Sequence, residues 1–257
     1  MKDQYVGDIG DYGKYGLLRF LANHGIKIGV NWYRTKNDVP PTNDGKMNQY
    51  LNDPYTYSCF DKDLFSELQK MDPENRWKTK SVLDVENVNL IPDAVYYHEV
   101  LDTTSLPKTE RKTARTKWHQ NALHALTDAQ LIFADPDNGT LGGKNITQKN
   151  AEKYVDPVEL LEYYKKGKDL VYYCHRARQS KVKWLDTVTE MKKYCTDSHI
   201  LVLTSHRGTQ RSYIFVIHSG SMKKYKNLLN DFLQEDWGVL KRNNWKDPFF
   251  TFDYISE

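Results

Sequence analysis

The stretch from Ala129 to Gly139, AQLIFADPDNG, carries the clearest strand signal in this sequence. It opens with a continuous apolar run, which is typical of a strand buried on both faces of a parallel sheet. We expect the strand to stop at Asp135 and Pro136, because proline lacks the N–H group that a central ladder requires. The polar residues that follow are therefore predicted to leave the sheet at its carboxyl edge.

Strands and helices alternate on both sides of this stretch. The predicted helices cover residues 17–23, 61–71, 107–126, 157–165, 180–194 and 221–233, and the predicted strands cover 26–33, 94–100, 129–135, 169–175 and two runs within 199–218. This order predicts the α/β class, with a mainly parallel, Rossmann-like sheet, helices on both faces, and an antiparallel C-terminal strand pair at one edge. We expect a single α/β domain over 1–257, with an irregular insertion around 34–128.

Composition limits the classes of protein to consider. The 37 basic and 34 acidic side chains leave a formal net charge of +3, too small to indicate nucleic-acid binding without a local basic patch. Cys59, Cys174 and Cys195 lack the spacing of a disulfide framework or a zinc site, which favours a reducing, cytoplasmic location. Neither a signal peptide nor an apolar run of about 20 residues is recognisable, so we expect no membrane partner.

Polar side chains cluster where two predicted strands end. Asp135, Asp137 and Asn138 follow one strand, and His175 closes the next. Ligands of α/β sheets bind at the carboxyl ends of strands, so we predict a catalytic site at these four residues. The two carboxylates have the chemistry to hold Mg²⁺ or Mn²⁺, or to accept hydrogen bonds from a substrate amine or hydroxyl. His175 is a candidate base or metal ligand, because imidazole titrates near neutral pH.

Two sets of arginines are candidate phosphate ligands of a nucleic acid or nucleotide, because a guanidinium binds phosphate in a bidentate manner. One set leaves the end of a predicted strand, and the other lies on a predicted basic helix. These arginines are Arg176 and Arg178, and Arg111 and Arg115. Arg211 belongs to a third basic set, in the loop between the last two predicted strands, which is more typical of a solvated surface.

The segment from Tyr5 to Gly16, YVGDIGDYGKYG, is rich in glycine for a stretch that leads into a helix. Glycine costs backbone entropy on folding, so we expect this backbone to lie close against a ligand in the pocket at the strand ends. Asp8, Asp11 and Lys14 would be the polar groups that it presents there. The sequence has no P-loop, no Gly-x-Ser-x-Gly elbow and no His-Glu-x-x-His motif, which disfavours P-loop ATPases, serine hydrolases and zincins.

The opening segment resembles the start of the large-subunit ribosomal RNA adenine methyltransferases. The order Gly7-Asp8, Asp11 and Lys14-Tyr15, ahead of a helix and the first strand, is similar to their Gly-Asn-x-x-Asp-x-x-Lys-His box. The resemblance implies that Asp8, Asp11 and Lys14 belong to a pocket for S-adenosylmethionine. It also implies that Lys14 lies near the carboxylate of this cofactor.

A second motif, LIFADPDNG, resembles the strand and Asp-Pro-Pro-Tyr loop with which amino-methylating enzymes hold the target nitrogen. The resemblance implies that Asp135 and Pro136 lie at the target amine. Asp137 and Asn138 stand where that loop has its second proline and its aromatic residue.

The sequence departs from this family after the first predicted strand. Asn31-Trp32-Tyr33-Arg34 stands where such enzymes carry a glycine-rich loop against the cofactor. Trp32 takes the place of that loop and is our candidate contact to the cofactor there.

Three functions are therefore open. The first is methyl transfer from S-adenosylmethionine to an amine of a nucleic acid or nucleotide, with Asp135 orienting the nitrogen. The second is metal-dependent hydrolysis by a nuclease or phosphodiesterase, in which Asp135 and Asp137 hold Mg²⁺ or Mn²⁺. The third is a non-catalytic factor of phage or host defence that binds a nucleotide or another protein. Both enzymatic hypotheses require Asp11, Lys14 and Asp135 to converge on one pocket.

Overall fold

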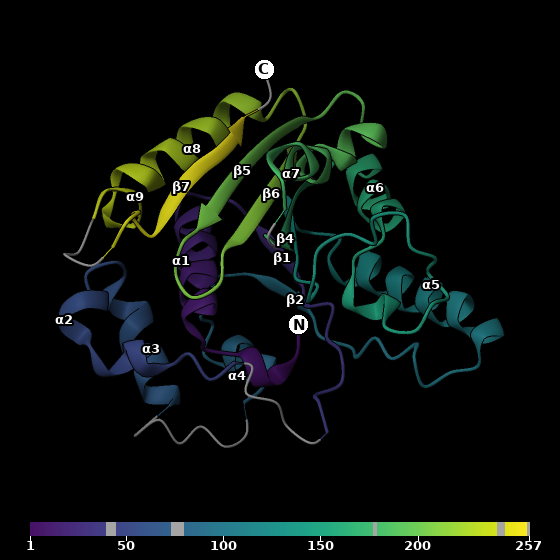
Figure 1. The fold of residues 1–257 in the computed structure, drawn as a ribbon, viewed down its shortest axis with the longest axis horizontal. Helices are drawn as coiled ribbons and strands as arrows, with labels where there is room; N and C mark the ends of the chain where they lie inside the picture. Colours follow the sequence, from purple (N-terminus) through teal and green to yellow (C-terminus); the bar gives the residue numbers. More distant parts are fainter. Residues whose placement is uncertain (40–44, 73–79, 177–178, 241–244, 256–257) are drawn as a thin grey trace.

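A seven-stranded sheet forms the centre of the protein in the computed structural model, which describes residues 1–39, 45–72, 80–176, 179–240 and 245–255 (Figure 1). The strands are β1 (Ile28–Asn31), β2 (Val95–Tyr97), β3 (Leu131–Ala134), β4 (Asp169–His175), β5 (His199–Ser205), β6 (Arg211–Ile217) and β7 (Phe250–Ile255). Their order across the sheet is β2-β1-β3-β4-β6-β5-β7. Strands β1 to β4 are parallel, whereas β6, β5 and β7 join through antiparallel pairings. The predicted α/β class with a mixed, Rossmann-like sheet is confirmed.

Helices cover both faces of the sheet (Figure 1). The α-helices are α1 (Ile9–Asn23), α2 (Pro54–Tyr57), α3 (Lys62–Met71), α4 (Val82–Asn87), α5 (Lys108–Ala125), α6 (Pro157–Lys165), α7 (Lys181–Val188), α8 (Met222–Gln234) and α9 (Asp236–Val239), and the 3₁₀ helices are η1 (Asp3–Tyr5), η2 (Gln49–Asn52), η4 (Ala151–Lys153) and η5 (Glu190–Lys193). One apolar core joins the sheet to α1 and α8, and a second core joins its other face to α5, α6 and α7. None of the helices in the described ranges is long and apolar enough to cross a membrane.

Strand β3 shows why its sequence is continuously apolar. Leu131 and Phe133 point into the core under α1, whereas Ile132 and Ala134 point into the core under α5 and α6. Successive side chains of a strand alternate between faces, so a strand covered on both faces needs apolar residues at every position.

The C-terminal antiparallel pair lies inside the sheet rather than at its edge. Strand β6 inserts between β4 and β5, and the edge is formed by β7, which the sequence did not predict. Only Phe250 of β7 is buried, and the other residues of the strand are partly exposed. The sequence of β7, FTFDYI, is nonetheless rich in aromatic and β-branched residues, a strand signal that the sequence analysis did not use.

The segment around 34–128 supplies more than an insertion. It contains β2, which pairs with β1 at the other edge of the sheet, and α5, which leads the chain back to β3. The short helices α2, α3 and α4 lie below the sheet beside α1 (Figure 1). Strand β2 and helix α5 fall within the ranges predicted for them, because both carry a local apolar pattern.

Helix α1 begins earlier than the apolar pattern predicted. The sequence suggested a helix from Leu17 onward, but the helix starts at Ile9 and includes most of the glycine-rich segment. Asp8 caps it, because its carboxylate accepts a 2.8 Å hydrogen bond from the Asp11 N–H. Such a cap satisfies a backbone donor that the first helical turn leaves without a partner.

The glycines of α1 leave room for side chains from elsewhere in this protein. Added Cβ atoms on Gly10, Gly13 and Gly16 would lie 1.7, 2.5 and 2.3 Å from atoms of Arg211, Phe249 and Trp237, respectively. Three glycines spaced one helical turn apart therefore let side chains from the C-terminal third pack directly on the helix backbone. Gly13 and Gly16 thus pack against side chains and do not line the cavity, whereas Gly10 lies under Arg211 and lines the cavity as predicted.

Candidate functional site

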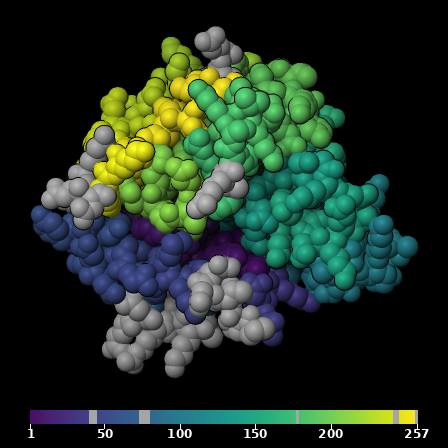
Figure 2. All heavy atoms as spheres, viewed as in Figure 1, coloured from purple at the N-terminus to yellow at the C-terminus, as the bar shows by residue number. Residues whose placement is uncertain are grey.

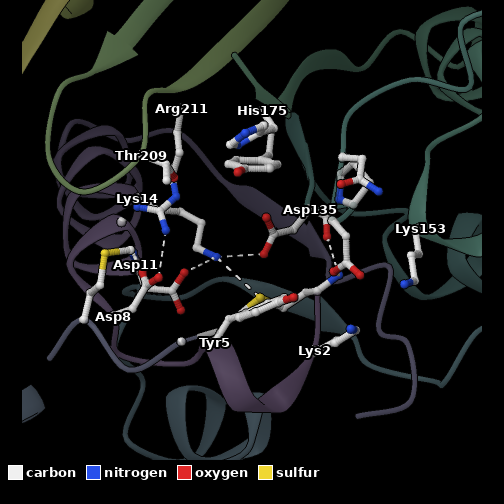
Figure 3. Close-up of a pocket in the computed structure, with 18 of the residues that line it drawn as sticks. Lys2, Tyr5, Asp8, Asp11, Lys14, Asp135, Lys153, His175, Thr209 and Arg211 are labelled. Carbon is white, nitrogen blue, oxygen red and sulfur yellow. Dashed lines mark hydrogen bonds and ion pairs between the residues drawn. The ribbon is translucent and has the colours of Figure 1, made fainter. Parts of the chain in front are cut away.

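A cavity of about 570 Å³ lies where β3 and β4 end, where β6 starts and where α1 begins (Figure 3). Strand β6 is antiparallel to β4, so its first residue, Arg211, lies opposite the last residue of β4, His175. The chain order reverses across β1, which has β2 on one side and β3 on the other. Ligands of α/β sheets bind outside the carboxyl ends of strands near such a reversal, and this cavity lies at the ends of β3 and β4, beside it. The volume is within the range of small-molecule sites, about 300–1,000 Å³.

Lys14 is the centre of a buried charge cluster in this cavity. Its ammonium lies 2.7 Å from Asp11 Oδ1 and 2.7 Å from Asp135 Oδ2. Figure 3 shows the lysine reaching from α1 toward the loop after β3. Burial lowers the pKa of Lys14, but the two carboxylates outweigh it and the net shift is upward, so the ammonium stays charged. Lys14 and its two carboxylates together carry one negative charge in excess.

Asp135 is the residue at which the two predicted motifs meet. Burial raises its pKa above the ordinary value of 3.8, and Lys14 counteracts part of that rise. Burial removes water from the charged form of the carboxyl group, and this effect exceeds the opposing effect of the nearby cation. Asp135 is therefore a better proton acceptor than a solvated aspartate.

A second buried pair, Asp8 with Arg211, closes one side of the cavity. The Arg211 guanidinium donates to Asp8 Oδ2 at 2.7 Å. It lies flat on the first turn of α1, where Gly10 leaves space for it. This pair ties the helix start to the start of β6.

His175 lies beside this pair on the cavity wall (Figure 3). Burial lowers the pKa of its imidazole, and the neighbouring Arg211 lowers it further. The ring is therefore neutral near pH 7 and has one nitrogen able to accept a proton.

Met1 occupies the remaining side of the site, next to the end of β1. Its ammonium donates to the carbonyl oxygens of Tyr33 and Asp135, each at 2.9 Å, and pairs with Asp137 Oδ1 at 3.0 Å. Its sulfur lies 3.9 Å from Lys14 Nζ. In the space-filling view the N-terminal residues, coloured purple, lie in a hollow between the blue, green and teal parts of the surface (Figure 2).

Most of the residues predicted for the site do converge. The residues that line the cavity and had been predicted from the sequence are Asp8, Asp11, Lys14, Asp135, Pro136, Asp137, Asn138 and His175. Trp32 does not line it. The Trp32 indole is buried behind Lys14, with its ring centre 5.5 Å from Lys14 Nζ, and its N–H donates to Glu86 at 2.8 Å. Trp32 thus supports Lys14 from behind.

The arginines predicted to bind phosphate lie elsewhere. Arg115 is fully buried on α5 and donates to Glu159 at 2.7 Å, and Arg111 donates to the carbonyl oxygens of Leu106 and Thr147. Both guanidiniums are used in holding α5 to the neighbouring loops, so neither is presented to a phosphate. The basic helix pattern was misleading because exposed lysines and buried arginines alternate along α5.

The two arginines after β4 also differ from expectation. Arg176 pairs with Asp253 of β7 at 2.9 Å and lies over the Trp184 ring at 5.0 Å, outside the cavity lining. Arg178 lies outside the described residues.

Arg211 is a cavity-lining side chain that the sequence analysis placed wrongly. It was interpreted as part of a surface loop, yet it opens β6 and is almost completely buried in the site. The sequence did contain a signal for this location, because Arg211 stands directly before the apolar run that forms β6. In an antiparallel partner of β4, that position returns to the carboxyl edge of the sheet.

The predicted acidic metal ligands are not gathered around one point. Within the part of the chain that the structure describes, no group of three or more histidine, cysteine, aspartate or glutamate side chains is placed to hold a metal ion. The space between Asp11 and Asp135 is taken by the Lys14 ammonium.

Comparison with known proteins gives a fold but no family. No protein family model matches the sequence, and no curated protein matches it. Among solved structures, the chain is similar to the crystal structure of protein LPL1258 from Legionella pneumophila str. Philadelphia 1, described with the family model DUF519. The TM-score is 0.52 at 13% sequence identity, and the match covers 98% of this chain and 99% of that chain. A likeness this distant in sequence supports the α/β architecture over the whole chain.

Proposed function

We propose that the cavity is the active site of a methyltransferase that uses S-adenosylmethionine to methylate an amine of a nucleic acid or nucleotide. The observation that carries the proposal is the 2.7 Å ion pair between Lys14 and Asp135, which lie 121 positions apart in the sequence. Each residue belongs to one of the two motifs that resemble ribosomal RNA adenine methyltransferases. An accidental likeness of two short motifs would not require their key side chains to meet in one cavity.

The contacts of Met1 can be compared with those that the amino-acid end of this cofactor would need. S-adenosylmethionine is a methionine whose sulfur carries an adenosyl group and a positive charge. The Met1 ammonium donates to two carbonyl oxygens and forms an ion pair with the Asp137 carboxylate, contacts that would also suit the α-ammonium of this cofactor. The residues that would hold the cofactor are therefore Tyr33, Asp135 and Asp137 at its ammonium, with Lys14 nearby.

The surroundings of β1 depart from a glycine-rich cofactor loop. Trp32 and Tyr33 are fully buried there, and the Tyr33 hydroxyl donates to Glu159 at 2.9 Å. Tyr33 has a φ of 42°, which a tyrosine rarely adopts. The chain thus makes its sharp turn after β1 with an aromatic residue. For the cofactor ammonium to bind at the end of β1, the Met1 ammonium would have to leave the carbonyl oxygens that it contacts.

The residues of the chain have separate tasks in this proposal. The cofactor supplies an electrophilic methyl group. Asp135 accepts a hydrogen bond from the target amine at its carboxylate, which orients the nitrogen lone pair and can take up a proton. Lys14 holds that carboxylate in place, and Asp11 holds Lys14. His175, at the end of the neighbouring strand β4, is a neutral proton acceptor in the cavity lining.

The cation between the carboxylates favours this proposal over metal-dependent hydrolysis. An aspartate pair that binds Mg²⁺ or Mn²⁺ must offer its oxygens to the metal. In this site Asp135 Oδ2 contacts the Lys14 ammonium at 2.7 Å, and Asp137 Oδ1 lies 3.0 Å from the Met1 ammonium. The lysine therefore already provides the compensating positive charge.

Two measurements test the proposed function. Calorimetry with S-adenosylmethionine and S-adenosylhomocysteine should show binding, and absence of binding by both at high micromolar concentration would reject the proposal. Transfer of a labelled methyl group should then be measured to single-stranded RNA and DNA oligonucleotides and to AMP, CMP and GMP. Asp135→Asn keeps the size of the side chain but cannot take up a proton, so it should retain S-adenosylhomocysteine binding and lose transfer. Asp128→Asn, at an exposed aspartate outside the cavity, is the matched control and should transfer normally.

A further inference from the structure

The turn after β1 holds a strained residue beside the candidate site. Tyr33 has a φ of 42°, in the left-handed region that a residue with a Cβ rarely adopts. Such a conformation persists only where surrounding contacts fix it, and it is often found at functional sites. At the end of β1 the Asn31 carbonyl oxygen accepts a 2.9 Å hydrogen bond from the Asp135 N–H, so the turn starts directly beside Asp135.

Three contacts hold Tyr33 in this conformation. Its N–H donates to Asn31 Oδ1 at 3.2 Å, and its hydroxyl donates to Glu159 Oε2 at 2.9 Å. Its ring packs against the Trp118 ring, with the ring centres 5.0 Å apart. Burial raises the pKa of Tyr33 and Glu159 raises it further, so the hydroxyl remains a donor. Asn31 and Tyr33 are fully buried, so water cannot replace these hydrogen bonds.

Helix α6 fixes the groups that hold Tyr33. The Asn31 amide donates to the Tyr163 hydroxyl at 3.2 Å. Glu159 accepts a 3.2 Å hydrogen bond from the Asp156 N–H, as part of the capping box that begins α6. This cap sets the position of Glu159 independently of its ion pair with Arg115. We call Asn31, Tyr33, Glu159 and Tyr163 the buried brace.

We propose that Tyr33, held through its hydroxyl by Glu159, is a positioning residue for the amino-acid end of the cofactor. The inference rests on the proposed function, which places that end of S-adenosylmethionine at this turn. A glycine-rich loop can take left-handed conformations because its residues lack a Cβ. This chain instead holds its turn with buried side-chain contacts that reach α6. The Tyr33 side chain lies in the core under α5 and α6, so it acts through the position of its own backbone.

Removing the hydroxyl should loosen the turn and weaken the binding of a ligand that uses it. Tyr33→Phe keeps the ring against Trp118 and leaves Glu159 its bonds from Arg115 and from the Asp156 N–H, so we expect the variant to fold. Calorimetry should show S-adenosylhomocysteine binding weakened about two- to tenfold, the value of one buried hydrogen bond. The affinity falls because the turn occupies its binding-competent conformation in a smaller fraction of molecules. Binding of 5′-methylthioadenosine, which lacks the amino-acid part, should not change.

A second variant tests the brace at its other end. Tyr163→Phe removes the acceptor of the Asn31 amide and should also weaken S-adenosylhomocysteine binding without changing that of 5′-methylthioadenosine. It keeps the proposal testable should Tyr33→Phe fail to fold. Tyr164→Phe is the matched control, because this neighbouring hydroxyl on α6 also donates to a carboxylate, that of Asp197, at 3.1 Å. Tyr164 lies outside the cavity lining, so this variant should bind both compounds as the wild type does.

The outcomes separate the brace from the proposed function. A loss of affinity that is confined to S-adenosylhomocysteine, in Tyr33→Phe and Tyr163→Phe but not in Tyr164→Phe, supports the positioning role. Equal binding by the wild type and both brace variants overturns that role and leaves the proposed function standing. The same holds if Tyr33→Phe weakens both compounds by one factor, or if Tyr164→Phe weakens S-adenosylhomocysteine binding as much. If S-adenosylhomocysteine binds neither the wild type nor any variant, the proposed function fails and the positioning role fails with it.

Discussion

Replacing Lys14 by methionine should destabilise the protein strongly. Methionine is close to lysine in length and removes only the ammonium, so Asp11 and Asp135 lose the cation that each contacts at 2.7 Å. Removing one partner of a buried ion pair costs about 3–5 kcal/mol in the free energy of unfolding, because the remaining charge is uncompensated. Asp11 keeps hydrogen bonds from the Gly7 N–H and the Tyr15 hydroxyl. We therefore expect a loss of about 4 kcal/mol at pH 7.5, most of it from Asp135.

This loss should depend on pH in a defined direction. Burial already raises the pKa of Asp135, and Lys14 lowers it, so removing Lys14 should raise the pKa further. A carboxyl whose pKa is higher in the folded than in the unfolded state makes folding less favourable as the pH rises through that interval. The difference between Lys14→Met and the wild type should therefore shrink between pH 7.5 and pH 5, where the orphaned carboxyl binds a proton.

Urea denaturation followed by tryptophan fluorescence measures both effects. Adding Asp135→Asn to Lys14→Met should recover about 1–3 kcal/mol, since neighbouring buried groups couple by that amount. Lys27→Met is the control, because Lys27 pairs with Asp128 at the surface at 3.9 Å and should cost less than about 1 kcal/mol. A Lys14→Met protein within about 1 kcal/mol of the wild type at both pH values would show that the buried charge cluster is not formed.

Two further predictions test the packing and the structural arginine. Gly16→Ala should destabilise the protein by about 1–3 kcal/mol although alanine favours helices by about 1 kcal/mol, because its Cβ would lie 2.3 Å from the Trp237 ring. Gly220→Ala, with nothing within 4 Å, is its control in the same urea titration, and a stabilised Gly16→Ala protein would contradict the packing. Arg115→Leu should cost about 3–5 kcal/mol by leaving Glu159 buried without its cation, and adding Glu159→Gln should recover part of that loss. Gly16→Ala and Arg115→Leu should both leave the affinity for S-adenosylhomocysteine unchanged in calorimetry. A weakened affinity of Arg115→Leu would indicate that Arg115 belongs to the binding site after all.

The apolar runs made most of the sheet predictable. Strand β4 coincides with its predicted range, and the hairpin of β5 and β6 falls inside 199–218. Each is buried on both faces, so each needs apolar residues at consecutive positions and shows a strong local signal. Strand β7 was not predicted, although its sequence FTFDYI is rich in aromatic and β-branched residues.

The position of the candidate site was predicted from the ends of these strands. Asp135 and His175 were predicted to meet because both follow parallel strands, and both line the cavity. The resemblance added Lys14, which the structure brings to Asp135. The cofactor and the reaction remain predictions, and the calorimetric and methyl-transfer experiments above are their tests.

Local patterns were a poor guide to the partners of charged residues. The sequence shows Arg115 as one member of a basic helix, and Arg211 as one member of a basic loop. In the structure Arg115 is bound to Glu159 and Arg211 to Asp8, partners 44 and 203 positions away, respectively. No periodicity of a single segment encodes such distances.

The sequence alone determined six strands of the sheet, its largely parallel start and the edge at which polar residues collect, because each depends on local hydrophobic periodicity and on strand direction. Only the tertiary structure decided which charges are buried together, why α1 is rich in glycine, and that Met1 lies against the carbonyl oxygens of Tyr33 and Asp135. Those features depend on contacts between distant parts of the chain. Burial and ion pairing are properties of the packed molecule, and they become visible only when the helices close over the sheet.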